Sequence, residues 1–438
     1  MKKNKERKRQ GTDEYLLKYE LFKSNAFVLI NKMIQLCNKT HGSQHLVDEI
    51  CYSIFFFGQI FDPNGNLNIY PKDIFGDDQT FIEKLSSKYN KPFEYFHSQT
   101  STERPLPRRS PFSCVLDMFV LQNGPEDEIQ IRKSLEDLVN ELKDMNLNLE
   151  KKFLDFKKGE PEENKQCLEF KKDLDKKKQD LDEKKKDLDE KNKDLDEKKQ
   201  DMEVTKNKLD VKNENLNFEK ECLDLEKKNL RLEKEIWKKK DLDLRREKKL
   251  ELVSTVICVS KYKNSEKHYG VSMSTTSLNA GRIVIAASCL SGYWNKYVAD
   301  AVMTYYPEQN QKKNEKKKKK DYFDGTFKLP ESISCKAYHI TKRTEMNPCI
   351  SCRNLFGLKE WENNLKEWEN NYGNCAEAEC LSNLLLDVSL EIKPEQHTYN
   401  PEDRENARAS VETVLKNTLK TVHFKWNGEY YPPQTQRP

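Results

Sequence analysis

Hydrophobic residues recur every three or four positions in the first part of the chain, which is the spacing of an amphipathic helix. One such stripe runs from residue 13 to about residue 40, and a second runs from His45 to Phe61. Pro63, Asn64 and Gly65 then indicate a turn, and three closely spaced prolines between residues 105 and 111 indicate a loop. We therefore predict a helical domain over residues 13–124, preceded by a basic tail over residues 1–12.

This N-terminal segment contains no cluster of acid, base and nucleophilic side chains. We interpret it as a helical adaptor or assembly domain that folds on its own, ends near Pro125 and takes no part in catalysis. If this is correct, deletion of residues 1–120 leaves any chemical activity of the remaining chain intact.

Residues 125–250 have a different pattern, which predicts a long helix. Gly124-Pro125 followed by acidic residues is typical of a helix start, and apolar residues alternate spacings of four and three from Ile131 to Leu149. Gly159 and Pro161 predict a break near residues 159–161. Beyond the break, one apolar residue occurs at every seventh position: Leu174, Leu181, Leu188, Leu195, Met202, Leu209, Leu216, Leu223, Leu230, Trp237 and Leu244.

A stable coiled coil needs a second apolar position in each heptad. Here the second position holds lysine or asparagine throughout, from Lys178 to Lys234. Two interpretations of this low-complexity heptad repeat remain open. The segment is either a weak parallel homodimer or a monomeric charged helix that folds back on the protein.

The polar second position leads to a prediction about association. We expect a fragment spanning residues 162–250 to be strongly helical but to associate weakly, with an affinity that changes with salt, because lysines occupy the seam. Analytical ultracentrifugation of the fragment at several ionic strengths measures this. A tight dimer that is indifferent to salt would contradict the prediction.

Composition limits the class of protein. Hydrophobic and charged residues each make up 35% of the chain, and the formal net charge of +4 gives no general argument for nucleic-acid binding. The N-terminus is too polar for a signal peptide, and the longest apolar stretch is too short to span a bilayer. Twelve scattered cysteines are then expected to be reduced thiols. We predict an intracellular protein, cytoplasmic or nuclear, that has no membrane partner.

Residues 251–438 have the pattern of a mixed α/β domain. The β-rich stretches 253–260 and 268–274 flank a polar turn and predict a hairpin, and 333–340 predicts another strand. An apolar run covers 282–289, and helices are expected over 297–305 and within 401–422, with a short strand over 423–426.

Two short segments of this domain contain candidate metal ligands. Cys349 and Cys352 form a Cys-x-x-Cys pair after Pro348, at a predicted helix start, where one metal ion can reach both sulfurs. Cys375 and Glu377 open a second apolar helix. Three thiolates with one vacant position describe a catalytic zinc site, with the carboxylate beside the open position.

These two segments resemble those of the cytidine deaminases. In that family a Cys-Ala-Glu helix and a Pro-Cys-x-x-Cys helix face each other around zinc, and zinc-bound hydroxide attacks the pyrimidine ring. The resemblance implies that Cys349, Cys352 and Cys375 bind zinc and that Glu377 shuttles protons. It also implies that Arg353 donates a hydrogen bond to a thiolate. The substrate would be a nucleoside or a pyrimidine base in nucleic acid.

The order of the two segments differs from that family. The Cys-Ala-Glu segment comes first there and second here, so the resemblance implies a permuted deaminase-like fold. Two alternatives stay open. The protein is a coiled-coil scaffold whose C-terminal domain is a binding module with a structural metal or none, or Cys349 and Cys352 perform redox chemistry.

Overall fold

The structure is a computed structural model. It describes residues 2–62, 68–76, 79–96, 103–155, 250–307, 319–359, 369–388 and 393–432, with side chains for all but 2–14, 79–81 and 152–155. The heptad repeat, its predicted break at 159–161 and its predicted association lie outside the described residues. The coiled coil and the weak homodimer therefore remain predictions.

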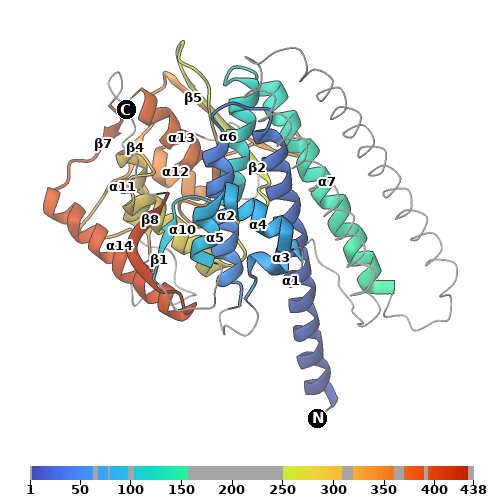
Figure 1. Ribbon diagram of the computed structural model, residues 1–438. Helices are drawn as coiled ribbons and strands as arrows, with labels where there is room; N and C mark the ends of the chain where they lie inside the picture. The colour runs from blue at the N-terminus through green and yellow to red at the C-terminus, as the bar shows by residue number, and fades with distance from the viewer. Residues whose placement is uncertain are drawn as a thin grey trace, which may run out of the picture. The chain divides into compact units, whose positions relative to one another are not determined.

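The N-terminal region is helical (Figure 1), as the apolar stripes predict. Helix α1 begins at Lys2, so the residues expected to form a basic tail belong to this helix. They are mostly lysine, arginine and glutamate, which favour helix. Helix α7 begins three residues after Pro125 rather than at it. The elements are α1 (Lys2–Cys37), α2 (Gln44–Gln59), α3 (Pro71–Phe75), α4 (Gln79–Lys88), α5 (Asn90–Phe96), β1 (Arg104–Pro107), α6 (Pro111–Asn123) and α7 (Glu128–Asp155).

The C-terminal region is mixed α/β, as predicted, with the hairpin and both cysteine-led helices in the expected places. The apolar run 282–289 lies within helix α10, which Ser277 caps by accepting a hydrogen bond from the backbone N–H of Ala280. The elements are β2 (Val256–Tyr262), β3 (His268–Val271), α10 (Leu278–Leu290), α11 (Lys296–Tyr305), β4 (Phe327–Lys328), β5 (Ile333–His339), β6 (Glu345–Met346), α12 (Ile350–Phe356), α13 (Ala376–Asp387), β7 (Glu395–Gln396), α14 (Pro401–Thr421) and β8 (Trp426–Tyr431).

The described residues form two compact units. The first contains residues up to 39, residues 72–88 and the part of α7 from residue 144; the second contains 40–71, 89–143 and 250–438. The second unit thus combines N-terminal helices with the C-terminal region. Strand β1, which precedes α6, pairs in parallel with β8 near the end of the chain. The domain boundaries near residues 124 and 251 stay predictions about which fragments fold alone.

The main sheet of the second unit has the strand order β3-β2-β5-β6, with antiparallel neighbours throughout. Helix α13 packs on β2 and β3, and its backbone lies close to Gly270. A Cβ atom at this position would lie 2.3 Å from the backbone nitrogen of Cys380, so a larger residue would push the helix away. The sheet therefore sets the position of the helix that Cys375 begins.

Among the described residues, no helix combines the length and the apolar character needed to cross a membrane.

Candidate metal centre

Helix α12 places Cys349 and Cys352 on one side of its first turn. Cys349 is the N-cap, with extended backbone (φ −71°, ψ 166°), and Cys352 follows three residues later on the same helix face. The helix is short because Gly357 ends it in the left-handed conformation (φ 63°). Pro348 precedes the cap and favours the extended conformation before the helix.

Cys375 occupies the matching position on the other helix. It is the N-cap of α13, again with extended backbone (φ −83°, ψ 153°). The chain turns into this cap at Gly373, whose φ of +83° favours glycine. Both helices thus begin at a candidate ligand. The positive ends of their dipoles stabilise negative charge on sulfur.

The structure brings the three predicted ligands together. The Sγ atom of Cys349 lies 3.7 Å from that of Cys352 and 3.4 Å from that of Cys375. All three sulfurs lie within 4.8 Å of one another. Two sulfurs bonded at about 2.3 Å to one tetrahedral zinc ion are about 3.8 Å apart. The three thiols therefore fit a metal of the size and softness of zinc.

Crowding of the three sulfurs determines their protonation. Hydrogen bonds from Cys352 and Cys375 lower the pKa of Cys349 to about 2. The same contacts with Cys349 raise the pKa values of Cys352 and Cys375 well above the usual value for a thiol. The three sulfurs therefore titrate as one coupled group. A divalent cation would favour three thiolates.

Asn370 is a member of the site that the sequence motifs do not reveal. Its side-chain amide donates a hydrogen bond to the Cys375 sulfur over 3.2 Å, while its backbone carbonyl accepts one from Ser351 of α12 over 2.6 Å. Asn370 therefore links the two cysteine helices. The predicted donor, Arg353, lies on α12, where its backbone N–H bonds to the carbonyl of Cys349. Its predicted bond to a thiolate stays a prediction.

Glu377 lies beside the thiols, in the first turn of α13. Its side chain is buried, and burial together with the negative charge on Cys349 raises its pKa to about 7. It lines a cavity of about 430 Å³ together with Pro348 and residues of β5 and β6. This volume is in the range of small-molecule binding sites. The site thus combines a three-thiol cluster, a buried acid and a cavity.

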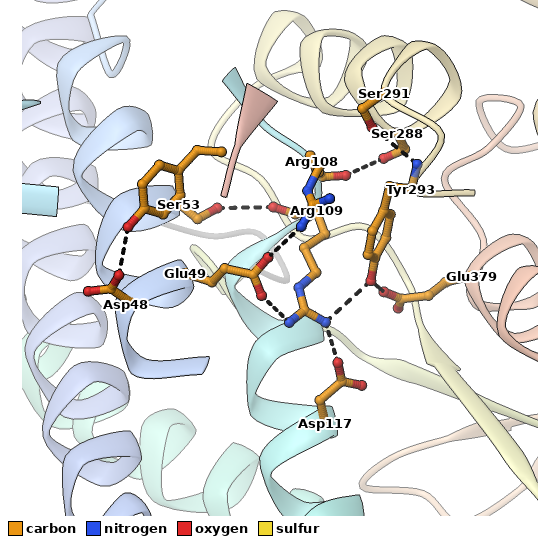
Figure 2. A network of polar contacts seen from close by, with 11 residues as sticks. Asp48, Glu49, Ser53, Arg108, Arg109, Asp117, Ser288, Ser291, Tyr293 and Glu379 are labelled. Carbon is orange, nitrogen blue, oxygen red and sulfur yellow. Dashed lines mark hydrogen bonds and ion pairs between the residues drawn. The ribbon is translucent and has the colours of Figure 1, made fainter. Parts of the chain in front are cut away.

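A buried polar network includes Glu379 of α13, the helix that Cys375 begins (Figure 2). Arg109, which precedes α6, points its guanidinium group at Glu49 of α2, Asp117 of α6 and the hydroxyl of Tyr293. The Tyr293 hydroxyl in turn donates to Glu379 of α13 over 3.3 Å. Arg109, Glu49 and Glu379 are each no more than 7% exposed. A buried charge of this kind is tolerated because each charged group in the network has a hydrogen-bonding or oppositely charged partner.

Glu379 connects this network to the helix of the metal centre. It accepts hydrogen bonds from Ser113 of α6 and from the backbone N–H of Val271 of β3. Glu379 and Cys375 also line one small cavity of about 10 Å³, which is close to the size of a single water molecule. Deletion of residues 1–120 would remove Arg109 and Ser113 from these contacts. The predicted deletion would therefore remove partners of Glu379 together with the N-terminal helices.

The fold and the site together define a mixed α/β unit that contains a candidate three-cysteine metal centre. In comparisons with known proteins, the chain matches no family model, no curated protein and no solved structure.

Proposed function

We propose that the chain is a zinc-dependent deaminase that acts on a pyrimidine base, either in a nucleoside or in nucleic acid. The observation that carries the proposal is the position of Glu377. A buried carboxyl group with a raised pKa adjoins three thiols at zinc-ligand spacing and also lines a cavity of about 430 Å³. A zinc site, an acid–base group and a space for substrate are the parts that hydrolytic deamination requires.

Ligand number favours a catalytic centre over a structural one. Structural zinc sites have four protein ligands, whereas catalytic sites have three and keep one position open. Among the residues that the structure describes, the group contains only Cys349, Cys352 and Cys375. Cys380, the nearest further thiol along α13, instead contacts Ser260 and the carbonyl of His268. This arrangement supports the deaminase over a scaffold with a structural metal.

The residues of the chain then have distinct roles. Bound zinc would supply a Lewis acid that makes water a nucleophile near neutral pH. Glu377 is placed to carry two protons from the attacking water, one to the ring nitrogen and a second to the leaving amine, because a buried carboxyl group with a raised pKa can both accept and donate protons. Asn370 holds the Cys375 sulfur in place. Leu329, Ile333 and Met346 give the cavity an apolar wall against which the base can pack.

Replacing Glu377 by glutamine tests this assignment. We expect Glu377→Gln to retain zinc and fold but to lose turnover by about 10²- to 10⁴-fold, the usual contribution of a general acid–base group, since an amide cannot transfer the proton. The measurement is ammonia release from cytosine, cytidine, cytidine monophosphate and a cytosine-containing single-stranded oligonucleotide.

Glu412→Gln is the matched control. Glu412 lies on α14, where it pairs with Lys416 at the surface and does not line the cavity, so its loss is expected to leave turnover nearly unchanged. If the zinc-loaded wild-type protein releases no ammonia from any of these substrates, the deaminase proposal fails. Equal activity of wild type and Glu377→Gln would show that Glu377 is not the acid–base group.

A further inference from the structure

A second thiol pair lies outside the metal centre, on the main sheet. The Sγ atoms of Cys258 on β2 and Cys335 on β5 are 3.5 Å apart. In the antiparallel register Cys258 pairs with Ala337 and Ser260 pairs with Cys335, so the two cysteines are diagonal neighbours on one face of the sheet. The pair packs with Ala376 at the start of α13.

The two thiols differ in their access to solvent. Cys258 is completely buried, whereas Cys335 is partly exposed and lines the cavity of about 430 Å³ that also contains Glu377. This cavity opens at the surface, since Lys336 and Lys359 in its lining have side chains that are 53% and 83% exposed. A small polar reagent can therefore reach Cys335 through the cavity and cannot reach Cys258 directly.

We propose that Cys335 and Cys258 form a modification site for hydrogen peroxide and similar small hydroperoxides. Cys335 is oxidised first, and Cys258 then converts it into a disulfide. In the first step the Cys335 sulfur attacks a peroxide oxygen, the O–O bond breaks, and a sulfenic acid and water form. In the second step the Cys258 sulfur attacks the Cys335 sulfur, the S–O bond breaks, and a second water leaves. The two thiols lose two protons and two electrons, which the peroxide takes up.

The geometry supports the order of these steps. A disulfide bond is about 2.05 Å long, so the two sulfurs must approach by about 1.5 Å. Diagonal neighbours on antiparallel strands lie about 7–8 Å apart, so β2 and β5 must also move slightly closer to reach the Cα separation of about 4.4–6.8 Å that a disulfide needs. Burial raises the pKa of the Cys258 thiol, which suits a resolving role rather than first attack. The pKa of Cys335 is also raised, because burial outweighs the lowering effect of its contact with Cys258. Its oxidation is therefore slower than that of a low-pKa thiolate and requires sustained exposure to peroxide.

The product would change the cavity wall beside Glu377. The disulfide joins β2 to β5 and draws the Cys335 sulfur from the cavity toward the core. The oxidation itself does not require the proposed deaminase activity, because neither cysteine belongs to the metal centre. The cavity that is proposed to bind substrate would then also admit the oxidant that reaches Cys335.

Peptide mapping of the full-length, zinc-loaded protein tests the proposal. The protein is treated with hydrogen peroxide, denatured, alkylated with iodoacetamide and digested for mass spectrometry. We expect the peptides that contain Cys258 and Cys335 to be joined, with a mass lower by two hydrogen atoms than the sum of the reduced peptides, and to separate with dithiothreitol. Recovery of both cysteines as alkylated thiols overturns the proposal, as does a disulfide from Cys335 to any other cysteine.

Three variants make the test specific. In Cys335→Ala, Cys258 should be recovered as an alkylated thiol, because the accessible partner is missing. In Cys258→Ala, the sulfenic acid on Cys335 should persist and react with dimedone. Cys289→Ala removes another buried thiol, on α10, and should still give the joined peptides. Joined peptides in Cys335→Ala, or a loss of joining in Cys289→Ala, would contradict the assignment.

Discussion

Replacing Arg109 by methionine is expected to lower the free energy of unfolding of the second unit by about 3–5 kcal/mol, because removing one partner of a buried ion pair leaves the other charge without compensation. Arg109 contacts Glu49, Asp117 and Tyr293, and both Arg109 and Glu49 have side chains that are 8% exposed. Urea unfolding followed by circular dichroism gives the difference in free energy.

Two further variants separate electrostatics from packing. Lys416→Met removes an exposed ion pair with Glu412 on α14 and should cost no more than about 0.5 kcal/mol. Arg109→Met combined with Glu49→Gln should cost less than Arg109→Met alone, since the buried charge left by the single change is then absent. A loss below about 1 kcal/mol for Arg109→Met would show that the network contributes little.

The second large effect concerns metal and stability. Adding zinc to the metal-free protein should raise the free energy of unfolding by about 4 kcal/mol when free zinc exceeds the dissociation constant a thousandfold, because the ion binds only the folded cluster tightly. For a unit of this size the unfolding temperature then rises by on the order of 10 °C. Differential scanning fluorimetry with and without zinc measures the shift.

The same experiment on two variants locates the ion. Cys352→Ala should remove the zinc-dependent shift, because the remaining thiols form an incomplete site. Cys289→Ala, which changes an equally buried thiol on α10, should keep the shift. A shift that survives in Cys352→Ala would assign the stabilising ion to another part of the chain.

Local signals in the sequence predicted the elements that hold the candidate ligands. Residues 253–274 have the alternation and polar turn of a hairpin, and they form β2 and β3. Pro348 before Cys349, and Gly373 before Cys375, indicate two helix starts, and both cysteines are N-caps. That the two segments meet was predicted from their three cysteines together with the resemblance to the cytidine deaminases, since three thiolates suit one metal ion.

Long-range contacts could not be predicted in the same way. Glu379 meets Ser113, which lies 266 residues earlier in the chain, and no local pattern relates two such positions. Asn370 lies within the second copy of a repeated Trp-Glu-Asn-Asn segment, and a repeat of this kind is typical of a surface loop, so its hydrogen bond to Cys375 has no sequence signal. The apolar run at 282–289 is consistent with either a buried strand or a buried helix, and the structure resolves it as α10.

The zinc content of the purified full-length protein tests the central claim most directly. The protein is prepared under reducing, chelator-free conditions, and the metal is measured by inductively coupled plasma mass spectrometry beside Cys375→Ala and Cys289→Ala. The three-thiol centre predicts one zinc per chain in the wild type and in Cys289→Ala, and none in Cys375→Ala. Absence of stoichiometric zinc from the wild type, or its retention in Cys375→Ala, would contradict the assignment of this centre and with it the proposed deaminase.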